Sequence, residues 1–147
     1  MATLLVATLA TVLAAAAAEA AGRGAPMEAT RNELAGFAIG SGRPALALQV
    51  DVVDGKVASA VPAVDGGGNL RAVRSGTDDE PMLTVSGALP VAVKFDLYLS
   101  QDGERFTYTS SCALTPGISS FEMWRQPVRE FALGNPRVVA NGKVRCE

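Results

Sequence analysis

Apolar residues alternate with smaller or polar ones along residues 45–53, which is the pattern of a half-buried β-strand. The dipeptide Asp54-Gly55 follows, and it suits a two-residue type I′ turn because both positions of that turn need positive φ angles. Folding the chain back at this turn aligns the apolar faces in three pairs: Val52 with Val57, Val50 with Ser59, and Leu48 with Val61. The pattern therefore predicts a β-hairpin over residues 45–61.

A longer alternation covers residues 91–100, where five apolar side chains fall on one face. Asp102-Gly103 marks the next turn, and residues 105–114 return along the first strand. A two-residue loop gives four pairs: Leu99 with Phe106, Leu97 with Tyr108, Phe95 with Ser110, and Val93 with Cys112. This register places Cys112 on the buried face of the hairpin.

The rest of the chain continues in short strands, which we expect at residues 70–74, 82–86, 119–124 and 128–133. Glycine and proline interrupt the chain at residues 115–117 and 134–136. A third hairpin around Asn141-Gly142 is expected to place Val139 opposite Val144 and Arg137 opposite Cys146. The many short strands and tight turns predict an all-β domain over residues 45–147. We expect an antiparallel β-sandwich that is immunoglobulin-like in architecture only.

The N-terminal stretch has a different character, because residues 2–18 carry no charge. Ala18-Glu19-Ala20 has the small-residue spacing that signal peptidase recognises, so residues 1–20 are expected to be a signal helix that is removed on export. The protein would then be periplasmic or extracellular. No basic residue precedes Arg23, which leaves an uncleaved membrane anchor as the alternative. Such an uncharged run is at the short limit for crossing about 30 Å of hydrocarbon.

After signal cleavage we expect no stable membrane span. Residues 21–44 are rich in Gly, Ala and Arg and are expected to form a flexible N-terminal segment with a short helix at residues 27–37. The three predicted parts of the chain are therefore residues 1–20, 21–44 and 45–147.

The chain contains two cysteines, Cys112 and Cys146. A small, even number of cysteines in an exported protein favours a disulfide. A redox pair usually has C-x-x-C spacing, whereas these residues lie 34 positions apart. Two thiolates without histidine cannot complete a tetrahedral metal site unless carboxylates join them. Trp124 lies between the cysteines, as in immunoglobulin domains, but the 22-residue distance from Trp124 to Cys146 is far too short for that family.

Catalytic chemistry is restricted because the sequence has no histidine. This excludes Ser-His-Asp and Cys-His catalysis and any metal site with histidine ligands. Glu122 and Glu130 flank a turn and would approach each other across paired strands in a carboxylate-dependent hydrolase. We expect neither a cofactor nor catalytic residues.

Two features remain as a candidate binding surface. Asp78, Asp79 and Glu80 form an acidic turn whose hard oxygens suit Ca²⁺, although the ordered spacing of a calcium loop is missing. Trp124 is expected to be an aromatic residue of the core or its rim, with a platform for ligand stacking as the alternative.

Charge narrows the possible partners. Without residues 1–20 the chain loses Glu19 and keeps 13 basic and 14 acidic side chains, a net charge of −1, which argues against nucleic acid. We therefore expect an exported, disulfide-stapled sandwich that binds a protein or a glycan of the envelope or extracellular space and is not an enzyme. The alternatives are a small carboxylate-dependent hydrolase and a structural subunit that assembles by β-strand addition. Arg71 and Arg74 argue against the latter if residues 70–74 form an edge strand.

Overall fold

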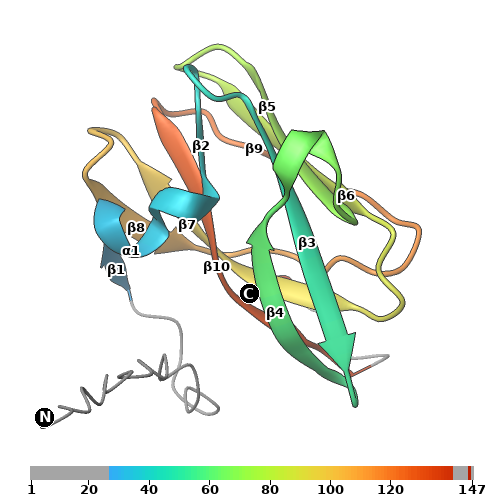
Figure 1. Cartoon of the computed structure of the whole chain (residues 1–147). Coiled ribbons are helices and arrows are strands. Elements are labelled where there is room, and N and C mark those ends of the chain that lie inside the picture. The colour runs from blue at the N-terminus through green and yellow to red at the C-terminus, as the bar shows by residue number, and fades with distance from the viewer. Residues whose placement is uncertain (1–26, 141–145, 147) are drawn as a thin grey trace, which may run out of the picture.

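Two antiparallel sheets of five strands each form a β-sandwich in the computed structural model, which describes residues 27–140 and Cys146 (Figure 1). Sheet A has the strand order β1-β8-β7-β10-β2, and sheet B has the order β4-β3-β5-β6-β9. The strands of the described residues are β1 (Glu28–Thr30), β2 (Ala38–Gly40), β3 (Ala45–Val53), β4 (Lys56–Pro62), β5 (Leu70–Gly76), β6 (Pro81–Gly87), β7 (Val93–Ser100), β8 (Arg105–Thr109), β9 (Ser120–Met123) and β10 (Glu130–Val138). The expected all-β, antiparallel sandwich is confirmed.

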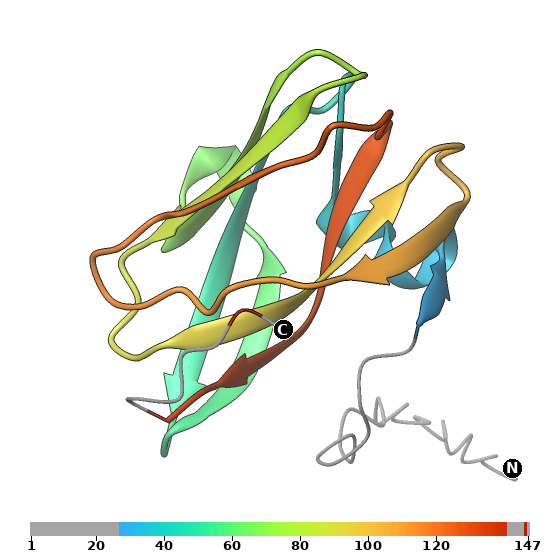
Figure 2. The ribbon, with the colours of Figure 1, turned by 180° about the vertical axis from the view of Figure 1, so that it is seen from behind.

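One hydrophobic core fills the space between the sheets, and it consists of the inward-facing side chains of both. Its largest fully buried members are Phe131, Ile39, Leu46, Leu48, Leu70, Leu83 and Leu97. The sheets do not overlap completely. Figures 1 and 2 show β1 and β8 at the side of the molecule that is farthest from β3, β5 and β6.

The β3–β4 hairpin turns where expected, at Asp54-Gly55, whose φ angles are 49° and 70°. Val52 pairs with Val57, as predicted. Beyond that pair the register shifts by one residue at Ala58, and the observed pairs are Val50 with Ala60 and Leu48 with Pro62. The predicted pairing of Leu48 with Val61 is therefore wrong, because an alternating pattern does not reveal a β-bulge. Val61 is 49% exposed as a result.

The β7–β8 hairpin also differs from its prediction by one residue. Asp102 Oδ1 accepts the backbone N–H groups of Glu104 and Arg105 at 2.8 and 2.9 Å, which stabilises a loop longer than two residues. Leu99 therefore pairs with Thr107, and Phe106 lies on the opposite face of sheet A from the main core. The predicted pairing of Leu99 with Phe106 is wrong.

Residues 28–40, expected within a flexible segment, belong to the sandwich. β1 pairs with β8 and β2 pairs with β10, and between them lie the short helix α1 (Arg31–Leu34) and a 3-10 helix (Ala35–Phe37). Together they cover a second apolar cluster on the outer face of sheet A, formed by Leu34, Ala38, Tyr98, Phe106 and Ala132. The domain therefore starts before the predicted boundary at residue 45. No helix of the described residues is long and apolar enough to span a membrane.

β10 continues through Gly134-Asn135-Pro136, where the sequence predicts a break. Two residues bulge out between the pairs that Gly134 and Arg137 make with β7, and Asn135 has a φ angle of 42°. The bulge directs Asn135 and Arg137 at Asp96, which is fully buried. Asn135 Nδ2 donates to Asp96 Oδ2 at 3.0 Å, and Arg137 Nη1 lies 2.8 Å from Oδ1, although its N–H is not aligned for a hydrogen bond.

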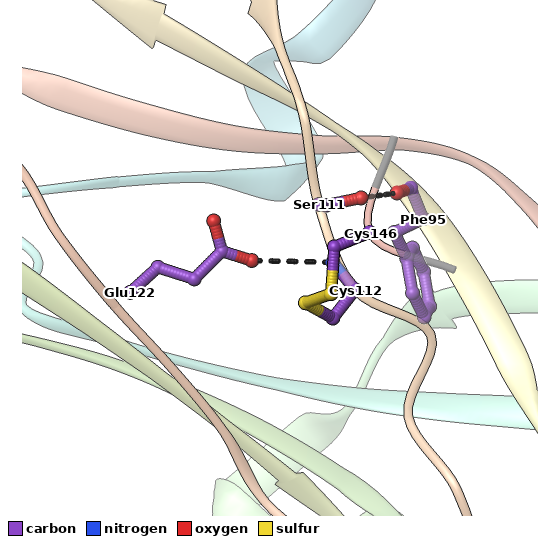
Figure 3. Close-up of a disulfide and its surroundings, with 5 residues drawn as sticks. All are labelled: Phe95, Ser111, Cys112, Glu122 and Cys146. Carbon is purple, nitrogen blue, oxygen red and sulfur yellow. Dashed lines mark hydrogen bonds between the residues drawn. A yellow bond between two sulfur atoms is a disulfide. The ribbon is translucent and has the colours of Figure 1, made fainter. Parts of the chain in front are cut away.

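The predicted disulfide between Cys112 and Cys146 is confirmed, with Cα atoms 4.0 Å apart (Figure 3). It joins the connection between β8 and β9 to the C-terminal end. Cys112 is half-buried and Cys146 is exposed, so the bond lies at the rim of the sandwich. Val93 bridges to Leu114 rather than to Cys112. The shifted β7–β8 register accounts for one of these two residues, and a further shift between Thr109 and Leu114 accounts for the other. The predicted signal helix and the turn at Asn141-Gly142 lie outside the described residues.

Candidate functional site

The structure brings Trp124 and the acidic turn (residues 78–80) to the same end of sheet B. Trp124 directly follows β9, and its backbone N–H donates to the carbonyl of Pro81 at 3.1 Å. Gly76, with a φ angle of 79°, begins the turn, and a Cβ atom there would lie 2.4 Å from the carbonyl oxygen of Glu80. The turn is therefore held close to the end of β9, and the two parts of the candidate surface are neighbours.

Arg74 compensates part of the acidic turn from within the sandwich. Its side chain is on the inward face of β5 and is buried, and its guanidinium donates to Asp78 Oδ1 at 2.5 Å and to the carbonyl of Val128 at 3.2 Å. The N–H of Val128 donates in turn to the carbonyl of Asp78 at 3.0 Å. Asp78 thus joins the turn to the β9–β10 connection, while Asp79 and Glu80 are exposed. Within residues 27–140, no group of three acidic or sulfur-containing side chains could hold a metal ion.

Trp124 faces inward. Its ring packs on Phe131 with centroids 4.9 Å apart and planes tilted by 45°, and it is half-buried against the main core. This is the position of a rim aromatic. Only the part of the ring that remains exposed is available to a ligand.

The outer face of β9 carries two apolar side chains that point into solvent. Phe121 is 69% exposed and Met123 is 63% exposed. They pair with Thr84 and Met82 of β6, so the two methionines lie directly opposite each other. The pattern of residues 119–124 contains this pair, but it does not say which face is buried. The signal that could have decided it is Trp124, whose bulk favours burial of its own face.

The backbone of the same two residues faces the free edge of sheet B. Among the described strands, β9 is the last of the sheet and pairs only with β6. The bond from Trp124 N–H to Pro81 sets the alternation of the ladder, in which every second residue of an antiparallel edge strand directs its N–H and C=O outward. By this alternation, Glu122 bonds toward β6, and Phe121 and Met123 direct their backbone groups away from β6, toward the outer edge of the sheet.

Glu122 is turned under the edge strand, toward the disulfide (Figure 3). Its Oε1 accepts the backbone N–H of Cys112 at 3.4 Å. Burial raises the pKa of Glu122, and the hydrogen bonds from Cys112 and Ser120 and the charge of Lys94 oppose that shift.

Glu130 lies in the other sheet, where it forms an ion pair with Arg31. The expected approach of Glu122 and Glu130 across paired strands is therefore wrong, because β9 and β10 belong to different sheets. The strand pairing that would have brought the two carboxylates together is therefore not formed.

The edges of the sandwich also differ from expectation. β5, which includes Arg71 and Arg74, is the central strand of sheet B, so these arginines do not protect an edge. The opposite edge strand, β4, has a bulge and contains Lys56 and Pro62, features that discourage strand pairing. β9 contains neither a basic residue nor proline.

We call the outer face and free edge of β9, with Met82 and the exposed acids Asp79 and Glu80, the β9 surface. It combines backbone groups that no described strand pairs, exposed apolar side chains and negative charge at one end. Arg125, which is exposed and follows Trp124, is the nearest basic residue along the chain. No protein-family model, no curated protein and no solved structure matches the chain.

Proposed function

We propose that this protein is exported and acts by binding, without catalysis, and that its β9 surface holds an extended segment of a partner protein. One observation carries the proposal: Phe121 and Met123 present both exposed side chains and edge-facing backbone groups on the last strand of sheet B. An extended peptide that adds a strand to such an edge gains main-chain hydrogen bonds, and side-chain contacts on the sheet face give it specificity.

The composition of the surface suggests the chemistry of the partner segment. Apolar side chains at alternate positions would cover Phe121 and Met123 on the outer face of sheet B. A lysine or arginine at one end would lie near Asp79 and Glu80, whose charges Arg74 does not compensate. The partner we propose is therefore a protein segment with alternating apolar residues and a basic end.

Two features of β9 limit indiscriminate pairing. The strand is only four residues long, and Glu122 places a charged group under it. Short edge strands and inward-pointing charges are both devices that reduce edge-to-edge aggregation. A partner must therefore contribute side-chain contacts in addition to its backbone.

Export is supported by the uncharged run at residues 2–18 and by the disulfide, which is typical of a non-reducing compartment. Intact-mass measurement of the exported protein should find a chain that starts within a few residues of Ala21. Leucine at both Ala18 and Ala20 should block this cleavage, because signal peptidase needs small side chains there. The matched variant Ala15→Leu should be cleaved normally. A full-length chain in the membrane fraction would contradict the proposal.

Partner binding can be tested with a photo-crosslinking amino acid at position 121 or 123 in the native host. We expect both positions to crosslink to the same contiguous segment of one protein, and we expect that segment to contain a basic residue. A synthetic peptide of the segment should bind the purified protein. Phe121→Ser should weaken this binding at least about tenfold, as expected for an anchoring aromatic side chain.

The matched control is Val53→Ser, because Val53 is 56% exposed and lies on the hairpin at the opposite edge of sheet B. It should leave peptide binding unchanged. Asp79→Lys together with Glu80→Lys should weaken binding of the basic peptide and reduce its dependence on salt. Equal crosslinking at positions 53 and 121, or peptide binding that Phe121→Ser does not affect, would overturn the proposal.

A further inference from the structure

A groove of about 520 Å³ lies between the β7–β8 hairpin and residues 126–128. It exists because β8 extends beyond the part of sheet A that sheet B covers (Figure 2). Its size is in the range of sites for small ligands. Leu99, Thr107 and Thr109 share the face of sheet A that lines it, and Gln126-Pro127 forms the facing wall.

The lining is rich in uncharged groups that donate and accept hydrogen bonds. Five such side chains contribute to it: Gln101, Thr107, Tyr108, Thr109 and Gln126. The side chains of Gln101, Thr107, Thr109 and Gln126 make no hydrogen bond to the described part of the protein. A hydroxyl or a carboxamide can donate and accept at once, so this set matches a ligand that carries many hydroxyl groups.

The charged groups of the groove largely compensate one another. Backbone N–H groups of Arg105 and Glu104 hold the pKa of Asp102 well below its ordinary range, so this carboxylate is ionised. The Arg105 guanidinium lies 3.4 Å from it and forms an ion pair. Glu28 of β1 is the remaining charge of the lining. The two carboxylates, Asp102 and Glu28, would repel a polyanion. Asp102 already forms an ion pair with Arg105, so it attracts a polycation less strongly.

The loop between β7 and β8, at one end of the groove, is held in place by hydrogen bonds to the Asp102 carboxylate. Asp102 also accepts the hydroxyl of Ser100 at 3.1 Å, and that hydroxyl oxygen accepts the N–H of Gly103 at 2.9 Å. β8 is held on both sides, by β1 and by β7. A ligand therefore meets groups that are already in position, which lowers the entropic cost of binding.

We propose that this groove binds a short, neutral oligosaccharide. The hydroxyl and amide groups of Thr107, Thr109 and Gln126 hydrogen-bond the sugar hydroxyls, and Leu99 and Pro127 contact the apolar faces of the rings. This site is separate from the β9 surface, and it does not depend on the proposed partner segment.

Calorimetric titration with neutral tetrasaccharides (cellotetraose, maltotetraose and chitotetraose) tests the proposal. We expect at least one of them to bind saturably below about 1 mM. Tetragalacturonate, as the anionic probe, and the chitosan tetramer, as the cationic probe, should bind at least tenfold more weakly, about 1.4 kcal/mol. If a charged probe binds best, or if none of the five binds, the proposal is wrong.

Variants locate the site. Thr107→Val and Thr109→Val keep the side-chain shape and remove the hydroxyl, and together they should weaken binding at least about tenfold. The matched control is Thr84→Val on the outer face of sheet B, which should bind like the wild type. Phe121→Ser should also leave sugar binding unchanged, so failure of the β9 proposal is distinguishable from failure of this one. Sugar binding that the Thr107 and Thr109 changes leave intact would overturn the assignment of the groove.

Discussion

Replacing Cys112 by Ser is expected to lower the free energy of unfolding by about 2–5 kcal/mol. The disulfide closes a loop of 34 residues and joins the β8–β9 connection to the C-terminal end. Without it, the unfolded chain gains conformational freedom and the terminal segment can separate from the sandwich. Chemical denaturation of the oxidised wild type and the variant measures this difference.

Four controls define the result. Cys146→Ser and the double variant should have the same stability as Cys112→Ser, because each removes one and the same bond. Reduction of the wild type should have the same effect. Ser110→Ala, an exposed position two residues away, should change stability by less than about 0.5 kcal/mol. A Cys112→Ser protein as stable as the wild type would show that the bond does not stabilise the fold.

Replacing Arg137 by Met should cost about 3 kcal/mol. Asp96 is fully buried, and after the substitution its carboxylate keeps only the amide of Asn135 among its polar partners in the described structure. Removing one member of a buried ion pair typically costs about 3–5 kcal/mol. We expect the lower end of that range because Arg137 itself is 39% exposed and solvent screens its charge.

The matched control is Arg105→Met, which removes an ion pair with Asp102 that is largely exposed and should cost about 0–1 kcal/mol. Asp96→Asn combined with Arg137→Met should recover much of the lost stability, since the buried group is then neutral. Equal destabilisation by Arg105→Met and Arg137→Met would contradict the buried-pair account.

The alternating pattern predicts strand pairing correctly up to the point where a β-bulge adds a single residue to a strand. Asp54-Gly55 and the pair of Val52 with Val57 follow from local turn chemistry, and the sequence predicts both. Ala58 then shifts the ladder, and no residue type marks that position as a bulge. Similarly, Asp102-Gly103 indicates a turn, but the loop length depends on hydrogen bonds to the Asp102 carboxylate.

The candidate site shows the same division. Composition and turn residues single out Trp124 and the acidic turn, and the structure places them side by side because Trp124 bonds to Pro81. The sequence does not predict Phe121 and Met123 as binding residues, because that role depends on the position of β9 at the edge of sheet B. Strand order is set by long-range pairing, so short-range patterns do not contain it. The same reason explains why Arg71 and Arg74 are in a central strand.

The order of strands in sheet A has a consequence for the time course of folding. β1 and β2 are the first strands of the described residues, yet β1 pairs with β8, and β2 pairs with β10, where Gly40 lies opposite Glu130. A chain that emerges N-terminus first therefore carries β1 unpaired until β8 has been synthesised, and β2 unpaired until β10 has been synthesised. Such sequence-distant contacts slow folding. Until β10 has been synthesised, β2 and the edge of β7 that β10 later covers lack their partner strand and are exposed to other chains. A holding factor that shields them would raise the yield of the native protein.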